Sequence, residues 1–421
     1  MSNQSTKSDN MNDDGMLNAE TQRKLPQGKI LQPKLRFKGF TDPWQQRKLG
    51  ELGFTYSGLS GKNKSDFGHG SAYFVTYLNV FSNPIADCYG IEAVEIDDKQ
   101  HKVITGDIFF TASSETPEDV GMTSLWLGAQ DNLYLNSFCF GYRMTANHNS
   151  IFMAYSLRSP QFRSKIQLLA QGISRFNISK KKVMELISTF PSLSEQIRIG
   201  EFFRVLDDLI AAAKKKADLL KLKKRYYLQA IFSQQLRFKG FTEPWQQRKL
   251  GELLSVRKET TTTPTLYRID IELENLQEDG GLVGDTTVRT NSTSVFRRGD
   301  VLFGRLRPYL RKWWLATEPG IRSGEIWAIY SPSRVLTSSF VYALVQSPIF
   351  LQVALITSGT KMPRSDWENI ASAAGSLPCS NDEQARIGDF FNMLDNLIAA
   401  SWRKIELLER CKAAYLQLLF I

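Results

Sequence analysis

Residues 35–52 read LRFKGFTDPWQQRKLGEL, and residues 236–253 read LRFKGFTEPWQQRKLGEL. The two stretches differ only at Asp42 and Glu243. A second matched pair, EQIRIGEFFRVLDDLIAA from Glu195 and EQARIGDFFNMLDNLIAA from Glu383, follows later in each copy. An internal repeat has to be recognised first, because it decides the architecture of the whole chain. The chain is therefore two copies of one unit, residues 35–232 and 236–420.

The stretches between the matched blocks barely resemble each other. They share GDIFF from Gly106 with GDVLF from Gly299, and a Ser-Pro pair at 159–160 with another at 347–348. An ordinary duplication that drifted would not leave one flank nearly identical and its neighbour unrecognisable. The pattern indicates one scaffold that carries two different bodies.

Each copy ends in a long helical pattern without internal proline, and its apolar positions step by four and three as in a coiled-coil seam. We predict that the two helices pair with each other in antiparallel orientation. The alternative is that each helix packs only on its own body. Lys224 and Lys412 interrupt equivalent seam positions; they either fix the register or, as we favour, extend to solvent. The predicted seam residues are Ile199, Phe203, Leu206, Ile210, Leu220 and Tyr227 in the first helix, and Ile387, Phe391, Leu394, Ile398, Leu408 and Tyr415 in the second.

The bodies combine both types of secondary structure. Strand-like runs such as SAYFVTYLNVF, KVITGDIFFT and GEIWAIYS alternate with helix-like runs such as SIFMAYSLRSPQFRSKIQLLA and SSFVYALVQSPIFLQVALIT. The predicted fold class is mixed α/β, with two globular domains separated by two long antiparallel helices. The predicted divisions are a disordered polar tail (1–32), a first domain (33–191), a first long helix (192–235), a second domain (236–379) and a second long helix (380–421).

Composition indicates a globular protein and allows a polyanionic partner, either nucleic acid or an acidic membrane surface. The 421 residues include 53 Lys and Arg against 43 Asp and Glu, a net charge of +10. Most of the excess lies on the repeated front blocks and on the first long helix, whereas residues 53–191 carry equal numbers of both signs. The 4 cysteines show no metal-ligand spacing, and no apolar run is long enough to span a membrane. We expect a cytoplasmic protein.

These motifs, in this order and present twice, resemble the specificity subunit of type I restriction-modification systems. The resemblance covers residues 33–420. It rests on the FKGFT(D/E)PWQQRKLGEL blocks, the GD-plus-strand element, the S-P-x-F helix and the EQxxIxxFFxxLDxLI helices. It implies two target-recognition domains, each of which reads one half of an asymmetric split DNA site.

The resemblance also implies partners and cofactors. The long helices would bind two methyltransferase subunits, which methylate adenine with S-adenosylmethionine. Two motor and nuclease subunits would add ATP- and magnesium-dependent cleavage. This chain itself would be non-catalytic and would hold no cofactor.

The motifs for chemistry in this chain are weak. GLSGKNKS from Gly58 is too short for a phosphate-binding loop and lacks Ser or Thr after its lysine. His69, His101 and His148 are scattered. The acidic run from Glu95 to Asp98 reads as a solvated turn rather than a nuclease site. We therefore predict no catalytic, cofactor-binding or metal-binding residues.

Residues that contact DNA should lie on loops of the divergent bodies, where cations bind phosphates and planar groups read base edges. Arg175, Asn177 and Arg364 are candidates for base contacts, and the lysines beside them for phosphate contacts. We expect Trp313, Trp314 and Trp327 to be core residues rather than base-stacking ones. The full set of candidates is Ser113, Ser114, Arg175, Asn177, Lys180, Lys181 and Lys182 in the first body, and Arg305, Arg307, Arg311, Lys312, Lys361 and Arg364 in the second.

Two other classes of function remain. A self-contained DNA-modifying enzyme would need an additional catalytic segment, and every stretch longer than the tail is already assigned. A generic coiled-coil scaffold with basic domains would bind DNA without sequence preference.

Overall fold

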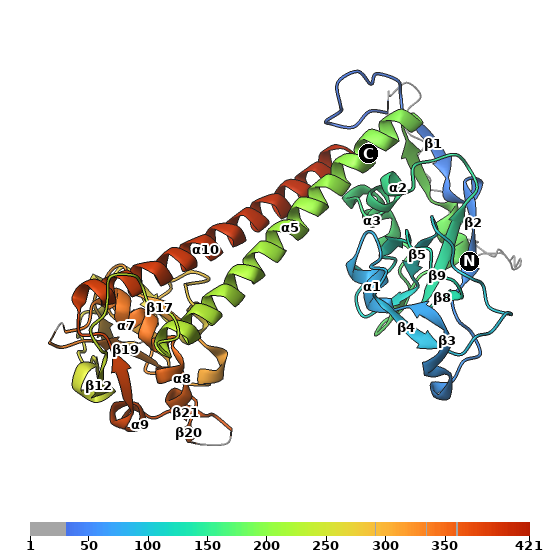
Figure 1. Cartoon of the computed structure of the whole chain (residues 1–421). Coiled ribbons are helices and arrows are strands. Elements are labelled where there is room, and N and C mark those ends of the chain that lie inside the picture. The colour runs from blue at the N-terminus through green and yellow to red at the C-terminus, as the bar shows by residue number, and fades with distance from the viewer. Residues whose placement is uncertain (1–30, 291, 334, 359–360) are drawn as a thin grey trace, which may run out of the picture. The chain divides into compact units, whose positions relative to one another are not determined.

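The computed structural model describes residues 31–290, 292–333, 335–358 and 361–421 (Figure 1). The predicted disordered tail, residues 1–32, falls almost entirely outside the described residues. The chain forms two compact units. Unit 1 runs to Arg204 and also takes in Ala413–Ile421, and unit 2 is Val205–Lys412.

Each unit contains short strands and short helices, and two long helices contribute to both units. The strands of unit 1 are β1 (Gln45–Lys48), β2 (Gly53–Ser57), β3 (Phe67–Val75), β4 (Ile91–Val94), β5 (Ile108–Thr111), β6 (Ser113–Ser114), β7 (Thr123–Leu125), β8 (Leu133–Leu135), β9 (Cys139–Met144), β10 (Phe176–Asn177) and β11 (Ile187–Phe190). Its short helices are α1 (Tyr77–Ser82), α2 (Ser150–Ser156), α3 (Pro160–Gln167) and α4 (Lys180–Glu185). The strands of unit 2 are β12 (Gln246–Lys249), β13 (Ser255–Val256), β14 (Asp270–Ile271), β15 (Ser294–Phe296), β16 (Val301–Gly304), β17 (Trp313–Leu315), β18 (Gly320–Arg322), β19 (Ile326–Tyr330), β20 (Thr357–Ser358), β21 (Arg364–Ser365) and β22 (Ala374–Leu377). Its short helices are α6 (Leu250–Leu253), α7 (Ser338–Val345), α8 (Pro348–Ala354) and α9 (Trp367–Ser372), and the long helices are α5 (Leu193–Phe232) and α10 (Asn381–Leu418).

The sheets repeat from one unit to the other. The main sheet of unit 1 has the strand order β2-β9-β5-β7, and that of unit 2 has the order β13-β19-β16-β17. In both, the strand after the Gly-Asp pair lies in the interior of the sheet, with Phe110 opposite Phe140 and Phe303 opposite Trp327. A separate antiparallel pair, β1 with β11 and β12 with β22, joins the front block of each copy to the segment before its long helix. Two dissimilar sequences therefore form the same arrangement of strands.

The two repeated sequence blocks meet in space. Arg36 of the first front block forms a bidentate ion pair with Glu195, at 2.7 and 2.8 Å, in the first turn of α5. Arg237 does the same with Glu383 of α10, at 2.7 and 2.8 Å. Glu195 and Glu383 are almost fully buried, so each needs its arginine. The repeated blocks thus make the same contact in both copies.

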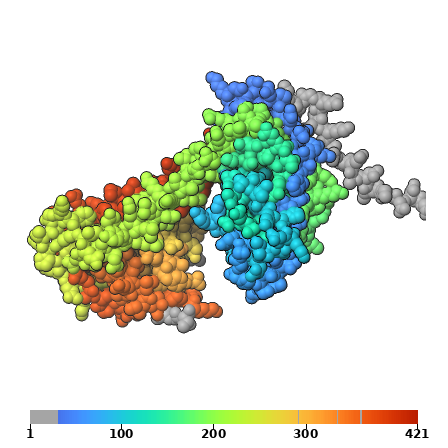
Figure 2. Space-filling model, turned by 45° about the vertical axis from the view of Figure 1, so that its right-hand side comes forward, coloured from blue at the N-terminus to red at the C-terminus, as the bar shows by residue number. Residues whose placement is uncertain are grey.

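The long helices pair in antiparallel orientation in unit 2, where Figures 1 and 2 both show α5 and α10 side by side. Lys224 contacts Asp395, Lys214 contacts Glu409 at 2.7 Å, and Lys412 contacts Asp207 at 2.5 Å, so residue numbers fall along α10 as they rise along α5. The predicted antiparallel pairing is confirmed.

The preference for solvent-extended lysines is wrong. Lys224 is buried and its ammonium is bound by a carboxylate of the opposite helix, and Lys412 is only partly exposed. A carboxylate one helix away offers an ammonium a partner without the need to reach water.

The ends of the long helices complete the cores of the bodies. In unit 1, Ile199 and Phe203 of α5 pack with strand residues such as Phe110, and so do Leu419 and Phe420, which directly follow α10. In unit 2, side chains near the end of α5 and the start of α10 join the core around Phe303. Among the predicted seam residues, Leu206 and Ile210 are also buried, whereas Leu220, Tyr227, Ile398, Leu408 and Tyr415 are half-buried.

Several predicted elements have different bounds. The run SAYFVTYLNVF is not one strand: β3 ends at Val75, and Thr76 caps the N-terminus of helix α1. The two runs predicted as single helices are each broken before Pro160 and Pro348, because proline cannot continue the helix that precedes it. No helix in the described part of the chain is long and apolar enough to cross a membrane.

Candidate nucleic-acid interface

The divergent loops of unit 1 meet at the end of β5. The amide of Ala112 donates to the carbonyl of Phe138 at 2.8 Å, and the amide of Ile178 donates to the carbonyl of Ala112 at 3.1 Å. Ser113 then pairs with Asn177 between β6 and β10. Ala112 at the end of β5, Phe138 before β9 and Asn177–Ile178 of the basic loop are thus joined by backbone hydrogen bonds. We name this meeting point the strand-end junction.

Unit 2 has the same strand-end junction. The amide of Arg305 donates to the carbonyl of Glu325, and the amide of Ser365 donates to the carbonyl of Arg305, both at 2.9 Å. Leu306 then bridges to Arg364. Backbone geometry therefore makes Arg305 the counterpart of Ala112, and Arg364 the counterpart of Asn177.

This register agrees with the Gly-Asp repeat. Gly106 and Gly299 are 193 residues apart, and the same offset carries Ser113 to Leu306 and Ser114 to Arg307. The strand pairing makes the same residues counterparts. Ser113 and Ser114 are buried, so their hydroxyls are less accessible than expected.

In unit 1, the predicted base-contacting residues lie close together on the surface. Arg175 is exposed, and its guanidinium lies over the ring of Phe138, 5.4 Å from the centroid. Asn177 is exposed two residues further on. Lys180 donates to the hydroxyl of Ser57 at 2.6 Å, and its neighbours Lys181 and Lys182 are exposed in the first turn of α4.

In unit 2, the two junction arginines differ in their contacts. Arg364 forms a bidentate ion pair with Glu325, with its Nε and Nη2 at 2.9 and 2.7 Å from the carboxylate oxygens. The hydrogen bond from Arg364 holds the pKa of Glu325 below its usual value. The guanidinium of Arg305 lies instead over the ring of Trp327, 5.4 Å from the centroid, and its Nε is buried without an acceptor in the described structure.

The remaining candidates of unit 2 fall into two groups. Arg307 and Lys361 are exposed beside the junction, and the amide of Arg307 donates to the carbonyl of Pro363 at 2.7 Å. Arg311 is paired with Asp279 at 2.7 Å, and Lys312 donates to the carbonyl of Leu273 at 2.8 Å. Arg311 and Lys312 are thus engaged within the protein.

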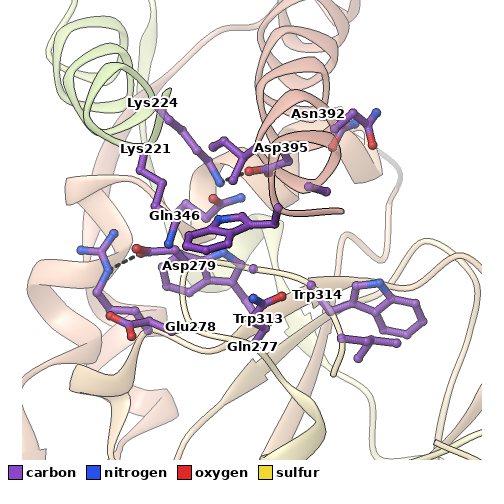
Figure 3. A pocket seen from close by; sticks show the side chains of 18 of the residues that line it. Lys221, Lys224, Gln277, Glu278, Asp279, Trp313, Trp314, Gln346, Asn392 and Asp395 are labelled. Atoms are coloured by element: carbon purple, nitrogen blue, oxygen red, sulfur yellow. Dashed lines mark hydrogen bonds and ion pairs between the residues drawn. The ribbon is translucent and has the colours of Figure 1, made fainter. Parts of the chain in front are cut away.

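Arg311 lines a groove of about 940 Å³ between the helix pair and the body of unit 2 (Figure 3). Lys224 and Asp395 point toward one another across it. Asp279 also forms an ion pair with Arg225 of α5, with 2.8 Å between Nη2 of the arginine and Oδ2 of the aspartate. This groove lies between helix and body, and the junction arginines Arg305 and Arg364 do not line it.

The weak motifs for chemistry have ordinary contacts. Glu95 pairs with His69 at 2.9 Å and Asp98 with Lys102 at 3.2 Å, as in a solvated turn. No group of three or more His, Cys, Asp or Glu that could hold a metal ion occurs in the described ranges. Trp313 and Trp327 are buried in the core of unit 2, and Trp314 is half-buried beside a second core cluster.

Sequence reasoning missed the partners of the candidate arginines. Phe138, Glu325 and Trp327 lie far from them in the chain, and only strand pairing brings them near. The one available signal was the repeated order of Gly-Asp strand, next strand and basic loop, which places these segments in the same sheet.

No protein-family model matches this chain, and no curated protein matches it in sequence. Among solved structures, it is similar to the S subunit of a type I restriction-modification system from M. genitalium, with a TM-score of 0.57 and 15% identity, over 93% of this chain and 99% of that one.

The fold is that of a type I restriction-modification specificity subunit. A second structure, described as showing complex assembly and conformational transition of the type I R-M system, matches with a TM-score of 0.53 and 17% identity, over 90% of this chain and 97% of that one. The specificity-subunit fold thus extends over nearly the whole chain, including both bodies and both long helices.

Proposed function

We propose that this chain is the DNA-specificity subunit of a type I restriction-modification complex. Each body binds one half of a split, asymmetric DNA site. The observation that carries the proposal is the strand-end junction, which has the same backbone in both units but presents Ala112, Phe138 and Asn177 in one and Arg305, Glu325 and Arg364 in the other. One backbone arrangement that presents two different sets of side chains is what reading two different half-sites requires.

The remaining parts of the function belong to partner subunits. Two methyltransferase subunits bind the long helices and transfer a methyl group from S-adenosylmethionine to adenine. Two motor and nuclease subunits supply ATP- and magnesium-dependent cleavage. The basic excess on the repeated blocks and on α5 favours long-range attraction to DNA and contact with these partners.

A domain exchange tests the proposal. Residues 54–190 are replaced by the corresponding body of another chain of this fold, and the methylated adenines made by the reconstituted complex are mapped by sequencing. We expect only one half of the methylated site to change. A change in both halves, or in neither, would contradict the assignment of one half-site to each body.

Binding to random duplexes separates this function from a generic scaffold. The full chain is assayed with and without methyltransferase subunits against a pool of random duplex DNA. A specificity subunit enriches a split sequence, whereas a scaffold that contacts only phosphates enriches none.

A further inference from the structure

We propose that Arg305 reads a guanine in the half-site bound by unit 2. This inference rests on the proposed function and adds a named residue, a named base and a geometric reason. It also assigns Glu325 to positioning rather than to base contact, because its carboxylate is already occupied by Arg364.

The backbone of Arg305 is held on both sides. Its backbone amide donates to the backbone carbonyl of Glu325, and its backbone carbonyl accepts from the amide of Ser365, both at 2.9 Å. Its guanidinium lies over Trp327, whose ring is buried and contacts Trp367 edge-on, with centroids 5.6 Å apart. The direction of the side chain is therefore set before DNA arrives, which lowers the entropic cost of binding.

Arg305 also keeps its hydrogen-bond donors. The other arginines with defined partners in this region, Arg364 and Arg311, are held by carboxylates. Arg305 forms no ion pair in the described part of unit 2, and its Nε has no acceptor. The residue is partly exposed, and its terminal Nη groups, unlike the buried Nε, remain to donate to an acceptor on a bound ligand.

The chemistry of the fork favours guanine. A guanidinium presents parallel donors that match O6 and N7 of guanine in the major groove, whereas adenine offers one acceptor beside a donor. A phosphate would also accept from this fork. However, the positive charge of Arg305 is close enough to Glu325 to help lower the pKa of that carboxyl group. The negative charge of the Glu325 carboxylate would repel a phosphate placed beside Arg305.

Unit 1 provides an internal contrast. The counterpart of Arg305 there is Ala112, which has no side-chain donor. Unit 1 must therefore read its half-site with other groups, and any effect of changing Arg305 should be confined to one half of the site.

The test uses the full chain with its methyltransferase subunits and a pool of random duplex DNA. Selected sequences are compared for the unchanged chain, Arg305→Ala, Arg305→Lys and the control Lys361→Ala. We expect Arg305→Ala to lower the preference for guanine at one position by about 10- to 100-fold, and Arg305→Lys not to restore it, because lysine lacks the planar fork. Lys361→Ala should weaken binding to all sequences alike.

The first half-site serves as the folding control within the same molecule. Full retention of the base preferences in Arg305→Ala, while the unchanged chain still selects a split site, would overturn the inference and leave the proposed function intact. A uniform loss that Arg305→Lys restores would identify a phosphate contact and also overturn it. Loss of both half-sites in Arg305→Ala but not in Arg305→Lys would assign a packing role instead. Selection of no sequence by the unchanged chain would refute the proposed function itself.

Discussion

Lys224 on α5 donates to Oδ1 of Asp395 on α10, and the repeat places the same pair, Lys412 with Asp207, at the corresponding positions of the opposite helices. The side chains of Lys224 and Asp395 are 6% and 24% exposed, whereas those of Lys412 and Asp207 are 21% and 29% exposed, so the two pairs differ mainly in the burial of the lysine. Burial lowers the pKa of Lys224 and raises that of Asp395. One interaction thus occurs twice in different surroundings, and the two copies serve as controls for each other.

The two lysines should differ in their contribution to stability. Lys224→Met leaves the carboxylate of Asp395 without its cation, and we expect a loss of about 3–5 kcal/mol. Lys412→Met, at a more hydrated pair, should cost roughly 1 kcal/mol. Urea unfolding followed by circular dichroism measures both. Adding Asp395→Leu to Lys224→Met should recover most of the loss, and equal losses for the two single variants would contradict the role of burial.

The arginines of the repeated front blocks should also differ. Arg36→Met and Arg237→Met each leave a buried glutamate without its cation, at a cost of about 3–5 kcal/mol. Glu383 keeps a hydrogen bond from the Trp245 indole at 3.1 Å, whereas the Trp44 indole nitrogen has no partner in the described structure. We therefore expect Arg36→Met to be the more damaging by about 1 kcal/mol.

Thermal and urea unfolding of Arg36→Met and Arg237→Met are measured beside a control variant at an exposed ion pair. Arg248 pairs with Glu252 at 2.9 Å with both side chains nearly half exposed, so Arg248→Met should change stability by at most about 0.5 kcal/mol. A larger loss for Arg237→Met than for Arg36→Met would show that the Trp245 hydrogen bond does not compensate.

Asp279 should contribute a pH-dependent stability to unit 2. Burial works to raise its pKa, but hydrogen bonds from Arg225 and Arg311 outweigh burial and lower the pKa below its usual value. A carboxyl group with a lowered pKa in the folded state adds stability above its unfolded pKa, near 4, and this stability is lost as the pH falls through the folded value. Asp279→Asn should therefore be less stable than the unchanged chain at pH 7, by about 2 kcal/mol.

The difference in stability between Asp279→Asn and the unchanged chain should shrink only below about pH 4. Urea unfolding from pH 3 to pH 7 measures this difference. A difference that disappears between pH 5 and pH 7 would exclude Asp279 as its source.

Matched insertions should preserve the helix pair. Seven residues added to α5 between Asp207 and Lys224 shift one ion pair relative to the other by about 10 Å, because a helix rises 1.5 Å per residue. We expect this chain to be destabilised. A second heptad in α10 between Asp395 and Lys412 should restore both pairs and the unfolding transition, and under the proposed function it should lengthen the gap between the half-sites. If stability is restored but the gap between the half-sites is unchanged, the length of the helix pair does not set that gap, unless the DNA bends to compensate.

The sequence was informative where spacing along one chain carries the signal. The duplicated blocks, the proline-free helices and their antiparallel pairing followed from identity and from a period near 3.5 residues. Boundaries were less predictable. The run after Val75 has strand-like composition, yet Thr76 caps a helix there, because a local cap outweighs propensity.

The candidate site was predictable as loops but not as contacts. Arg175, Asn177, Arg305 and Arg364 were named from basic character and position. Nothing in the sequence distinguished the arginine held by Glu325 from the one stacked on Trp327, because Trp327 lies on β19 and Glu325 directly precedes that strand, each more than 20 residues from the arginine that it contacts.

The sequence by itself thus determined the duplication, the paired helices and the division into one scaffold with two bodies, since these depend on periodicity and repetition. Only the tertiary structure decided that Asn177 and Arg364 are counterparts at the strand-end junction, that Lys224 is buried against Asp395, and which arginine keeps its donors. The physical reason is that hydrogen-bond register and burial arise between segments far apart in the chain, where residue spacing gives no measure of distance.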